Sequence, residues 1–337
     1  MFYFGCHSGG SLSRTPVIEF SVVPAAGAGS TDQLVPIEGR VKDAHPGQRI
    51  VLYARSGVWW VQPLVGNSFT AIQADSTWKG STHPGASYAA LVVDERYRPP
   101  AALADLPEPG GSVLAVNSVL GRRPDVPLKS VEFSGYQWEI RQTAGSPGGT
   151  RNAYDPSNVW TDHDGFLHLR VSQADGRWRC AEAVLTRSLG YGSYKYLVRD
   201  IGHFEPAAVL AFYTWDDSGP SREMNIEISR WGETEEKNAQ FVIQPYIVPA
   251  NTVRFNAPAG PSTFSMAWEP GRVSFSALRG AATFRGAAPV ASHLFTSGVP
   301  SPGNERVHLN LYVFDNKQRN PLQHEFEVII EKFEFLP

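Results

Sequence analysis

The stretch that decides the fold class of this chain is REMNIEIS, residues 222–229. Polar and apolar residues alternate in it with a period of two, which is typical of a strand with one buried face and one open face. Glu223, Asn225 and Glu227 therefore project from the same face of the predicted sheet. Two carboxylates held side by side repel each other, so the row is our first candidate for a binding or catalytic site.

Strand-like patterns continue on both sides of this stretch. Between residues 17 and 93, short β-like runs are separated by Pro, Gly and Asp turn signals, which predicts a small Ig-like β-sandwich over residues 15–98. From residue 131 to residue 336 strand follows strand, and no amphipathic helix of about 12 residues stands out. This part of the chain predicts a large sandwich or barrel.

Proline-rich sequence separates the two sets of strands. Prolines cluster within residues 98–100, 106–111 and 123–127, and this composition favours extended chain over helix. We therefore expect a linker over residues 99–128 and a second all-β domain over residues 129–337. Residues 1–14 are rich in Gly and Ser, and we expect them to be disordered.

Composition excludes some partners. The 337 residues suit two domains, and the net charge of -3 gives no electrostatic reason to bind nucleic acid or an anionic membrane. No run approaches the roughly 18 apolar residues of a membrane span. Cys6 and Cys180 lie far apart in the sequence, so we expect no disulfide between them and a small buried side chain at Cys180.

The second domain resembles glycoside hydrolase family 16, the laminarinase, lichenase and agarase group, which is built on the concanavalin A-like jelly roll. The Glu-x-Asn-x-Glu of residues 223–227 falls on the family's catalytic E-x-D-x-E motif. The resemblance covers nearly all of residues 130–337 and leaves the first domain out. Six further segments match in the family's order: residues 158–167, 181–194, 209–215, 263–270, 309–313 and 326–335.

This resemblance implies a retaining endo-glycoside hydrolase that acts on a β-linked polysaccharide, with Glu223 as nucleophile and Glu227 as general acid/base. Two positions depart from the family pattern. Asn225 replaces the central Asp, and Ala267 replaces the Glu of a later E-W-T-P motif. Asn keeps a hydrogen bond but removes a charge. We therefore expect Asn225 to favour ionised Glu223, to lower the pKa of Glu227, and to give a more acidic optimum.

The mechanism requires the two acids to converge. A retaining glycosidase holds its two carboxyl groups about 5–5.5 Å apart. Glu223 and Glu227 are four residues apart in the sequence, which on a flat strand separates their Cα atoms by about 13 Å. A strongly curved sheet and side chains that lean toward each other would close most of this gap.

Sugar rings bind to flat apolar surfaces and to planar hydrogen-bonding groups. Arg would also suit a sulfate or a carboxylate. In the first domain, the adjacent Trp59 and Trp60 must face opposite ways, so at most one is buried and the other is either an interface or a sugar-binding residue. The candidate substrate-binding residues near the acidic strand are Trp215, Trp231, Tyr213, Tyr246, Gln244, Arg230 and Trp268.

Two other functions stay open. One is a non-catalytic carbohydrate-binding protein, in which Asn225 marks lost catalysis. The other is a polysaccharide lyase, which would need a His/Tyr pair and a cation in the cleft.

The histidines show no metal-ligand spacing, so we expect no cofactor and no catalytic metal. Related sandwiches sometimes carry a structural calcium, which no motif here supports. We expect a monomer whose partner is a polysaccharide or oligosaccharide, in an extracellular or periplasmic location that follows from the function. The opening residues lack a complete signal peptide, and lipidation at Cys6 stays open.

Overall fold

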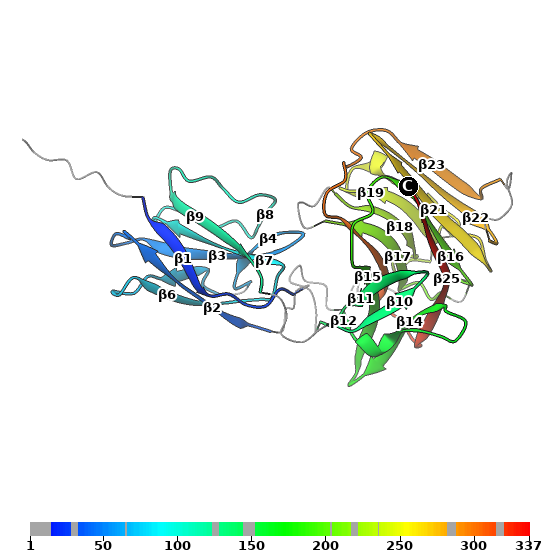
Figure 1. Ribbon diagram of the computed structural model, residues 1–337, viewed down its shortest axis with the longest axis horizontal. Coiled ribbons are helices and arrows are strands. Elements are labelled where there is room, and N and C mark those ends of the chain that lie inside the picture. The colour runs from blue at the N-terminus through cyan, green and yellow to red at the C-terminus, as the bar shows by residue number, and fades with distance from the viewer. Residues whose placement is uncertain are drawn as a thin grey trace, which may run out of the picture.

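The computed structural model describes residues 15–27, 33–64, 66–122, 128–143, 152–202, 204–216, 222–234, 236–281, 288–314 and 320–337. It contains two all-β bodies, which follow one another along the chain (Figure 1). The expected disorder of residues 1–14 lies outside the described residues, as does Cys6. Among the residues described, no helix has the length and apolar character needed to cross a membrane.

The first domain is a sandwich of two antiparallel sheets. Its core lies between them and includes Ile37, Trp78, Leu52 and Tyr88, all fully buried. The smaller sheet has the order β1 (Val17–Val22), β2 (Val35–Lys42) and β6 (Thr77–Thr82). The larger sheet has the order β8 (Ala102–Leu103), β4 (Val58–Gln62), β3 (Arg49–Ser56), β7 (Ser87–Val93) and β9 (Val113–Leu120), with β5 (Phe69–Ala71) paired to β3.

The expected linker over residues 99–128 needs correction. Strand β9 lies within that range and pairs with β7 from Ser87↔Leu120 to Val93↔Val113, so the first domain extends past residue 98. Strand β8, also within the range, pairs with β4. The prolines on both sides of β9 suggested a linker, and its VLAVNSVL sequence has no polar/apolar alternation that would have indicated a strand. Residues 123–127 of the expected linker lie outside the described residues.

The second domain is a larger antiparallel sandwich, which confirms the predicted jelly-roll class. One layer contains β20 (Thr252–Phe255), β19 (Ala239–Ile243), β18 (Met224–Ile228), β17 (Ala208–Trp215), β24 (Arg306–Val313), β15 (Arg177–Leu185), β11 (Tyr136–Ile140) and β10 (Ser130–Phe133). The other contains β14 (Leu167–Ala174), β25 (Phe326–Leu336), β16 (Gly192–Val198), β21 (Ser262–Glu269), β22 (Arg272–Arg279) and β23 (Ala291–Phe295). The remaining short elements are β12 (Ala153–Tyr154), β13 (Val159–Thr161), η1 (Pro156–Asn158) and η2 (Pro249–Asn251).

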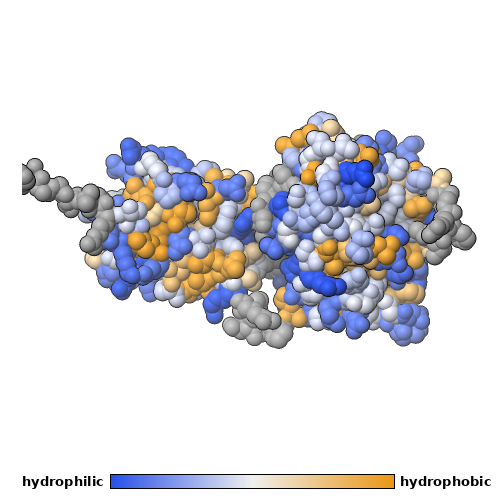
Figure 2. All heavy atoms as spheres, turned by 45° about the horizontal axis from the view of Figure 1, so that its top comes forward, coloured by the Kyte–Doolittle hydropathy of each residue, from blue (hydrophilic) through white to orange (hydrophobic). Residues whose placement is uncertain are grey.

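Aromatic and aliphatic side chains fill the space between these layers. Tyr196 of β16 stacks on Phe212 of β17 with ring centroids 4.4 Å apart, and Phe241 of β19 stacks on Phe275 of β22 at 5.3 Å. On the face shown in Figure 2, hydrophobic and hydrophilic residues are mixed over both domains, as is usual for a folded protein surface.

Strand β18 fixes the orientation of the acidic row. Its apolar residues, Met224, Ile226 and Ile228, are buried in the core between the layers, as the alternation predicts. Glu223, Asn225 and Glu227 therefore lie on the outer face of this layer. The layer that contains β17 and β18 lies on the side of the second domain that faces the first domain (Figure 1).

Candidate active site

One amide links the two carboxylates of the acidic row. The Nδ2 of Asn225 donates a hydrogen bond to Oε1 of Glu223 at 2.8 Å and a longer one to Oε1 of Glu227 at 3.5 Å. Both carboxylates are therefore within reach of a single nitrogen atom, although their residues are four apart in the sequence. The side chains of Glu223 and Glu227 therefore lean toward each other across Asn225.

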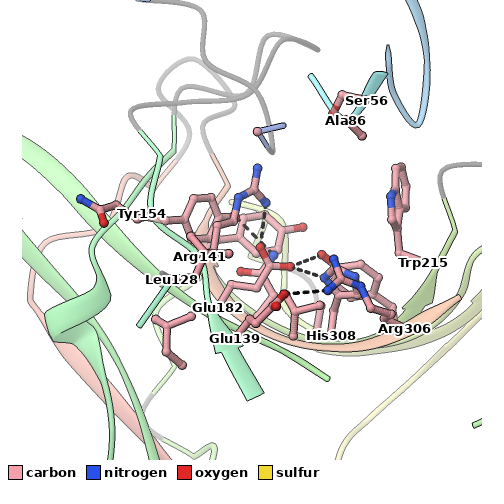
Figure 3. A pocket seen from close by; sticks show the side chains of 18 of the residues that line it. Ser56, Ala86, Leu128, Glu139, Arg141, Tyr154, Glu182, Trp215, Arg306 and His308 are labelled. Carbon is pink, nitrogen blue, oxygen red and sulfur yellow. Dashed lines mark hydrogen bonds and ion pairs between the residues drawn. The ribbon is translucent and has the colours of Figure 1, made fainter. Parts of the chain in front are cut away.

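The two acids line a cavity of about 830 Å³. Its floor is the outer face of β18, β17, β24, β15 and β11, and side chains from several of these strands point into it (Figure 3). In the register of the sheet, Glu227 pairs with Ala211 of β17, and Ala211 pairs in turn with Asn310 of β24. Asn310 then pairs with Glu182 of β15. The cavity therefore crosses the strands and leads away from the acidic row.

Burial dominates the electrostatics of the pair. Burial, followed by the charge of Glu227, raises the pKa of Glu223 to about 8, against the hydrogen bond from Asn225. Burial also raises the pKa of Glu227, but hydrogen bonds from Gln240 and Asn225 and the charge of Arg254 oppose the rise. Both pKa values therefore lie above the usual range of a Glu side chain, and the value of about 8 favours the protonated form of Glu223 at neutral pH.

The sequence predicts one of these effects on the pKa values. Asn225 does lower the pKa of both neighbours, as its amide donor predicts. What the sequence did not indicate is the size of the opposing effects. Burial and the second carboxylate outweigh one hydrogen bond, so the net pKa of Glu223 rises.

A second polar cluster lies beside the acidic row and centres on Glu182. Its carboxylate, only 1% exposed, accepts hydrogen bonds from Nη1 of Arg141 at 2.7 Å, from Nδ1 of His308 at 2.7 Å and from the hydroxyl of Tyr213. Burial alone would raise its pKa, but the charge of Arg141 and the hydrogen bond from His308 hold the pKa of Glu182 far below its usual range. Glu182 is therefore an ionised anchor for three side chains of the cavity.

Sequence reasoning missed this cluster as a site. Glu182 lies within residues 181–194, which match the family pattern, and His308 is one of the histidines that show no metal-ligand spacing. One local signal existed, because a carboxylate between Ala181 and Ala183 in an apolar strand must find a buried partner. The partners themselves come from distant parts of the chain.

On β24, two atoms of the side chains that line the cavity lack a hydrogen-bond partner among the described residues. They are Nε2 of His308 and Oδ1 of Asn310, on side chains that are 9% and 5% exposed. The Nδ1 of His308 is hydrogen-bonded to Glu182, and Nδ2 of Asn310 donates to the hydroxyl of Tyr154 at 3.3 Å. The Oδ1 of Asn310 is an acceptor, and Nε2 of His308 is one when the ring is neutral, so the floor is suited to a ligand that donates hydrogen bonds, as hydroxyl groups do.

The structure brings two of the predicted substrate-binding aromatics to the cavity. Trp215 and Tyr213 of β17 both line it. Tyr213 also stacks on His308, with ring centroids 4.6 Å apart and an interplanar angle of 18°. Trp268 is instead 1% exposed in the core, where its Nε1 donates to the carbonyl of Pro300. Strand β21 alternates so that Trp268 faces inward, which corrects its predicted role as a sugar platform.

Four other candidates lie outside the cavity lining. Arg230 and Trp231 follow the end of β18, where Arg230 donates to the carbonyl of Phe204 and the ring of Trp231 lies 4.6 Å from the guanidinium of Arg254. Gln244 and Tyr246 follow the end of β19, where the Oε1 of Gln244 accepts from the backbone of Tyr246. The chain leaves the sheet at both places, and this takes the four side chains away from the floor.

No metal site emerges from the described residues, in which no group of three or more His, Cys, Asp or Glu side chains is placed to hold an ion. Cys180 is free and buried.

Comparison with known proteins finds no matching family model and no matching curated sequence. Among solved structures, a Bacillus licheniformis β-glucanase is 15% identical, covers 55% of this chain and 85% of its own, and has a TM-score of 0.43. A lichenase derived from a mouse hindgut metagenome is 14% identical, covers 59% and 92%, and has a TM-score of 0.44. A family 16 glycosyl hydrolase of Mycobacterium smegmatis is 14% identical, covers 53% and 79%, and has a TM-score of 0.41.

Proposed function

We propose that this protein is a retaining endo-glycoside hydrolase that acts on a β-linked polysaccharide. The observation that carries the proposal is the single amide of Asn225, which is bonded to both carboxylates at the edge of a large cavity. Two carboxyl groups supply the nucleophile and the acid that retaining hydrolysis needs. The acceptor atoms of His308 and Asn310 on the floor suit sugar hydroxyl groups.

Glu223 acts as the nucleophile and Glu227 as the general acid/base, the roles that the family resemblance implies. In the free protein, burial and the charge of Glu227 raise the pKa of Glu223 to about 8, which favours protonated Glu223 at neutral pH. A glycosidic oxygen beside Glu227 accepts a hydrogen bond only from a protonated carboxyl group. Substrate therefore favours transfer of the proton to Glu227, and ionised Glu223 can then attack the anomeric carbon.

The first test is a panel of β-linked polysaccharides with detection of new reducing ends. We expect the wild-type protein to cleave at least one of them and Glu223→Gln to lose about a thousandfold or more of that activity, because the nucleophile is removed. Equal cleavage by both proteins would remove Glu223 from the mechanism. Binding without cleavage by the wild type would favour the carbohydrate-binding alternative.

A second test separates the two roles. Azide is a small anion that can take the place of either missing carboxylate. On the Glu223→Ala protein it should attack the sugar directly and give the α-glycosyl azide. On Glu227→Ala it should open the covalent intermediate and give the β-glycosyl azide. The opposite pair of products would exchange the two assignments.

A lyase remains the second candidate because of one observation. The cavity holds the His/Tyr pair and the cation that a lyase needs, in His308, Tyr213 and Arg141. The hydroxyl of Tyr213 and the guanidinium of Arg141 are, however, both bonded to Glu182, which occupies the groups a lyase would use. A lyase would give unsaturated products with strong ultraviolet absorbance. A hydrolase gives reducing ends without that absorbance.

A further inference from the structure

The cavity has a wall that belongs to the first domain. Ala26, Gly27, Ser56, Ala86 and Arg55 line the same cavity as the acidic row. Figure 3 shows Ser56 and Ala86 opposite the sheet, with Trp215 rising from the sheet toward them. The two domains also meet closely beside this wall, because a Cβ atom added to Gly57 would lie 2.5 Å from Cη2 of Trp215.

Hydrogen bonds hold the three segments of this wall together. The backbone N–H of Ala86 donates to the carbonyl of Arg55 at 2.9 Å, and that of Gly27 donates to the carbonyl of Gly85 at 3.1 Å. The hydroxyl of Tyr88, a fully buried residue, donates to the carbonyl of Ala25 at 2.9 Å and accepts from the N–H of Gly85 at 3.0 Å. The wall is therefore a fixed surface that exists before any ligand binds.

Arg55 is the charged residue of this wall. Two other arginines line the cavity, and both pair with carboxylates: Arg141 with Glu182 and Arg306 with Glu139 at 2.8 Å. Arg55 has no carboxylate partner among the described residues, and its buried Nε has no hydrogen-bond partner there. The guanidinium carbon of Arg55 lies 5.4 Å from the ring centroid of Trp59. Among the described residues, Arg55 is thus the cavity-lining arginine without a carboxylate partner.

We propose that the first domain supplies one wall of the substrate site and that Arg55 binds an anionic group on the sugar chain. A guanidinium group without a carboxylate partner fits the planar oxygen pair of a uronic acid carboxylate, and it also fits a sulfate ester. The rest of the wall is small and uncharged, which leaves room for a sugar ring. That the ligand is a glycan rests on the proposed function.

Binding to the inactive Glu223→Gln protein tests Arg55. The probes are laminarin as a neutral glycan, alginate as a uronate and carrageenan as a sulfate ester. We expect tighter binding of alginate or carrageenan than of laminarin, and about a tenfold or greater loss of that binding in Glu223→Gln/Arg55→Ala. Arg40→Ala is the matched control, because Arg40 is an exposed arginine of the same domain outside the cavity lining.

The outcomes are distinct. Preference for alginate identifies a carboxylate, and preference for carrageenan identifies a sulfate. Binding of laminarin alone, binding of none of the three, or equal loss in the Arg55 and Arg40 variants would overturn the proposal. Failure of the hydrolase mechanism would show separately, as cleavage that survives Glu223→Gln, and it leaves the Arg55 comparison intact.

A bulky residue in the wall gives an independent readout. Ala86→Phe places a ring in the cavity and should raise the dissociation constant for the preferred probe about tenfold. Ala71→Phe is the matched control, because Ala71 is exposed and pairs with Arg49 at the opposite end of β3 from Arg55. If circular dichroism shows both variants to be folded and they bind the probe with equal affinity, the wall does not touch the ligand.

Discussion

Asn225 gives one amide to two carboxylates, and this determines how the acidic row holds protons. Its nitrogen donates to both Glu223 and Glu227, and each hydrogen bond favours the ionised form of its partner. Its oxygen Oδ1 has no hydrogen-bond partner among the described residues. An Asp at this position could not donate when ionised and would add a third negative charge.

Asn225→Asp should therefore raise the pKa values of the pair and move the pH profile to higher pH. A like charge next to two partly buried carboxylates makes ionisation harder, and we expect a shift of about one unit in the alkaline limb of kcat/KM. The measurement is the rate of reducing-end release between pH 4 and pH 10, where the range brackets the pKa of about 8 at Glu223. Asn67→Asp, at an exposed site of the first domain, is the control. Superimposable profiles for wild type and Asn225→Asp would contradict the role of the amide.

Glu182 shows how a buried charge organises the same face. Removing one member of a buried ion pair leaves the other without compensation, which is costly. Arg141 has its charge next to Glu182 and its guanidinium 4.2 Å from the ring of Tyr154. His308 uses Nδ1 for Glu182, which fixes the orientation of its ring and of the open Nε2.

Glu182→Gln should lower the free energy of unfolding by about 3 kcal/mol at pH 7. The pKa of Glu182 is lower in the folded protein than in the unfolded chain, so ionised Glu182 stabilises the fold. This contribution to the free energy of unfolding is complete above the pKa of Glu in the unfolded chain, about 4.3, and is lost as the pH falls toward the pKa of Glu182 in the folded protein. The difference between wild type and variant, from urea denaturation, should thus shrink below about pH 4. Glu19→Gln, in an exposed pair with Lys42, should cost less than about 1 kcal/mol. An equal cost at both sites would contradict the anchoring role of Glu182.

At the scale of single elements, alternation in the sequence predicts which face a strand buries. It places Met224, Ile226 and Ile228 of β18 in the core, where they are. It does not indicate strand β9, whose VLAVNSVL sequence lacks alternation and is flanked by prolines that suggested a linker. Trp268 also lies on the face that alternation predicts to be buried, although we expected it to bind sugar. Its strand alternates with Trp268 on the inner face, and a large apolar ring stays there.

Alternation does not predict which strands are neighbours. Strand β24 lies beside β17, although about 90 residues of chain separate them. His308 and Asn310 reach the acidic row only through this pairing, and Arg141 reaches it from the chain after β11. The acidic half of the site is thus a property of one strand and could be predicted. The half around Glu182 comes from the topology and could not.

The two tryptophans provide a test of this reasoning at the level of their strands. Trp268→Ala should lower the free energy of unfolding by about 3–5 kcal/mol, because it leaves a cavity in the core. The fraction that stays folded should bind glycan as the wild type does. Trp215→Ala should cost less stability and weaken glycan binding about tenfold, because Trp215 lines the cavity. Denaturant unfolding and binding to the Glu223→Gln background measure both effects. Selective loss of binding in Trp268→Ala would contradict the assignment of that residue to the core.

At the scale of the whole molecule, the site is built from two domains. The second domain supplies the floor and the acids, and the first supplies a wall with Arg55. Contact between domains leaves no periodic pattern in a sequence, so neither the wall nor Arg55 could be predicted. The tip between β3 and β4 reaches Trp215 because its turn has Gly57, at φ 70°, with no side chain.

Gly57→Ala should therefore weaken glycan binding more than a comparable change elsewhere. The substitution adds two effects: strain of about 1 kcal/mol from the left-handed backbone, and a Cβ atom 2.5 Å from the ring of Trp215. Gly47→Ala adds the first effect alone, because Gly47 has φ 86° and nothing within 4 Å of its added Cβ. Both variants should lose similar stability in thermal unfolding. Only Gly57→Ala should raise KM, by about threefold or more, since the wall must move away from the sheet. Equal KM values for the two variants would show that the wall and the sheet act independently on the substrate.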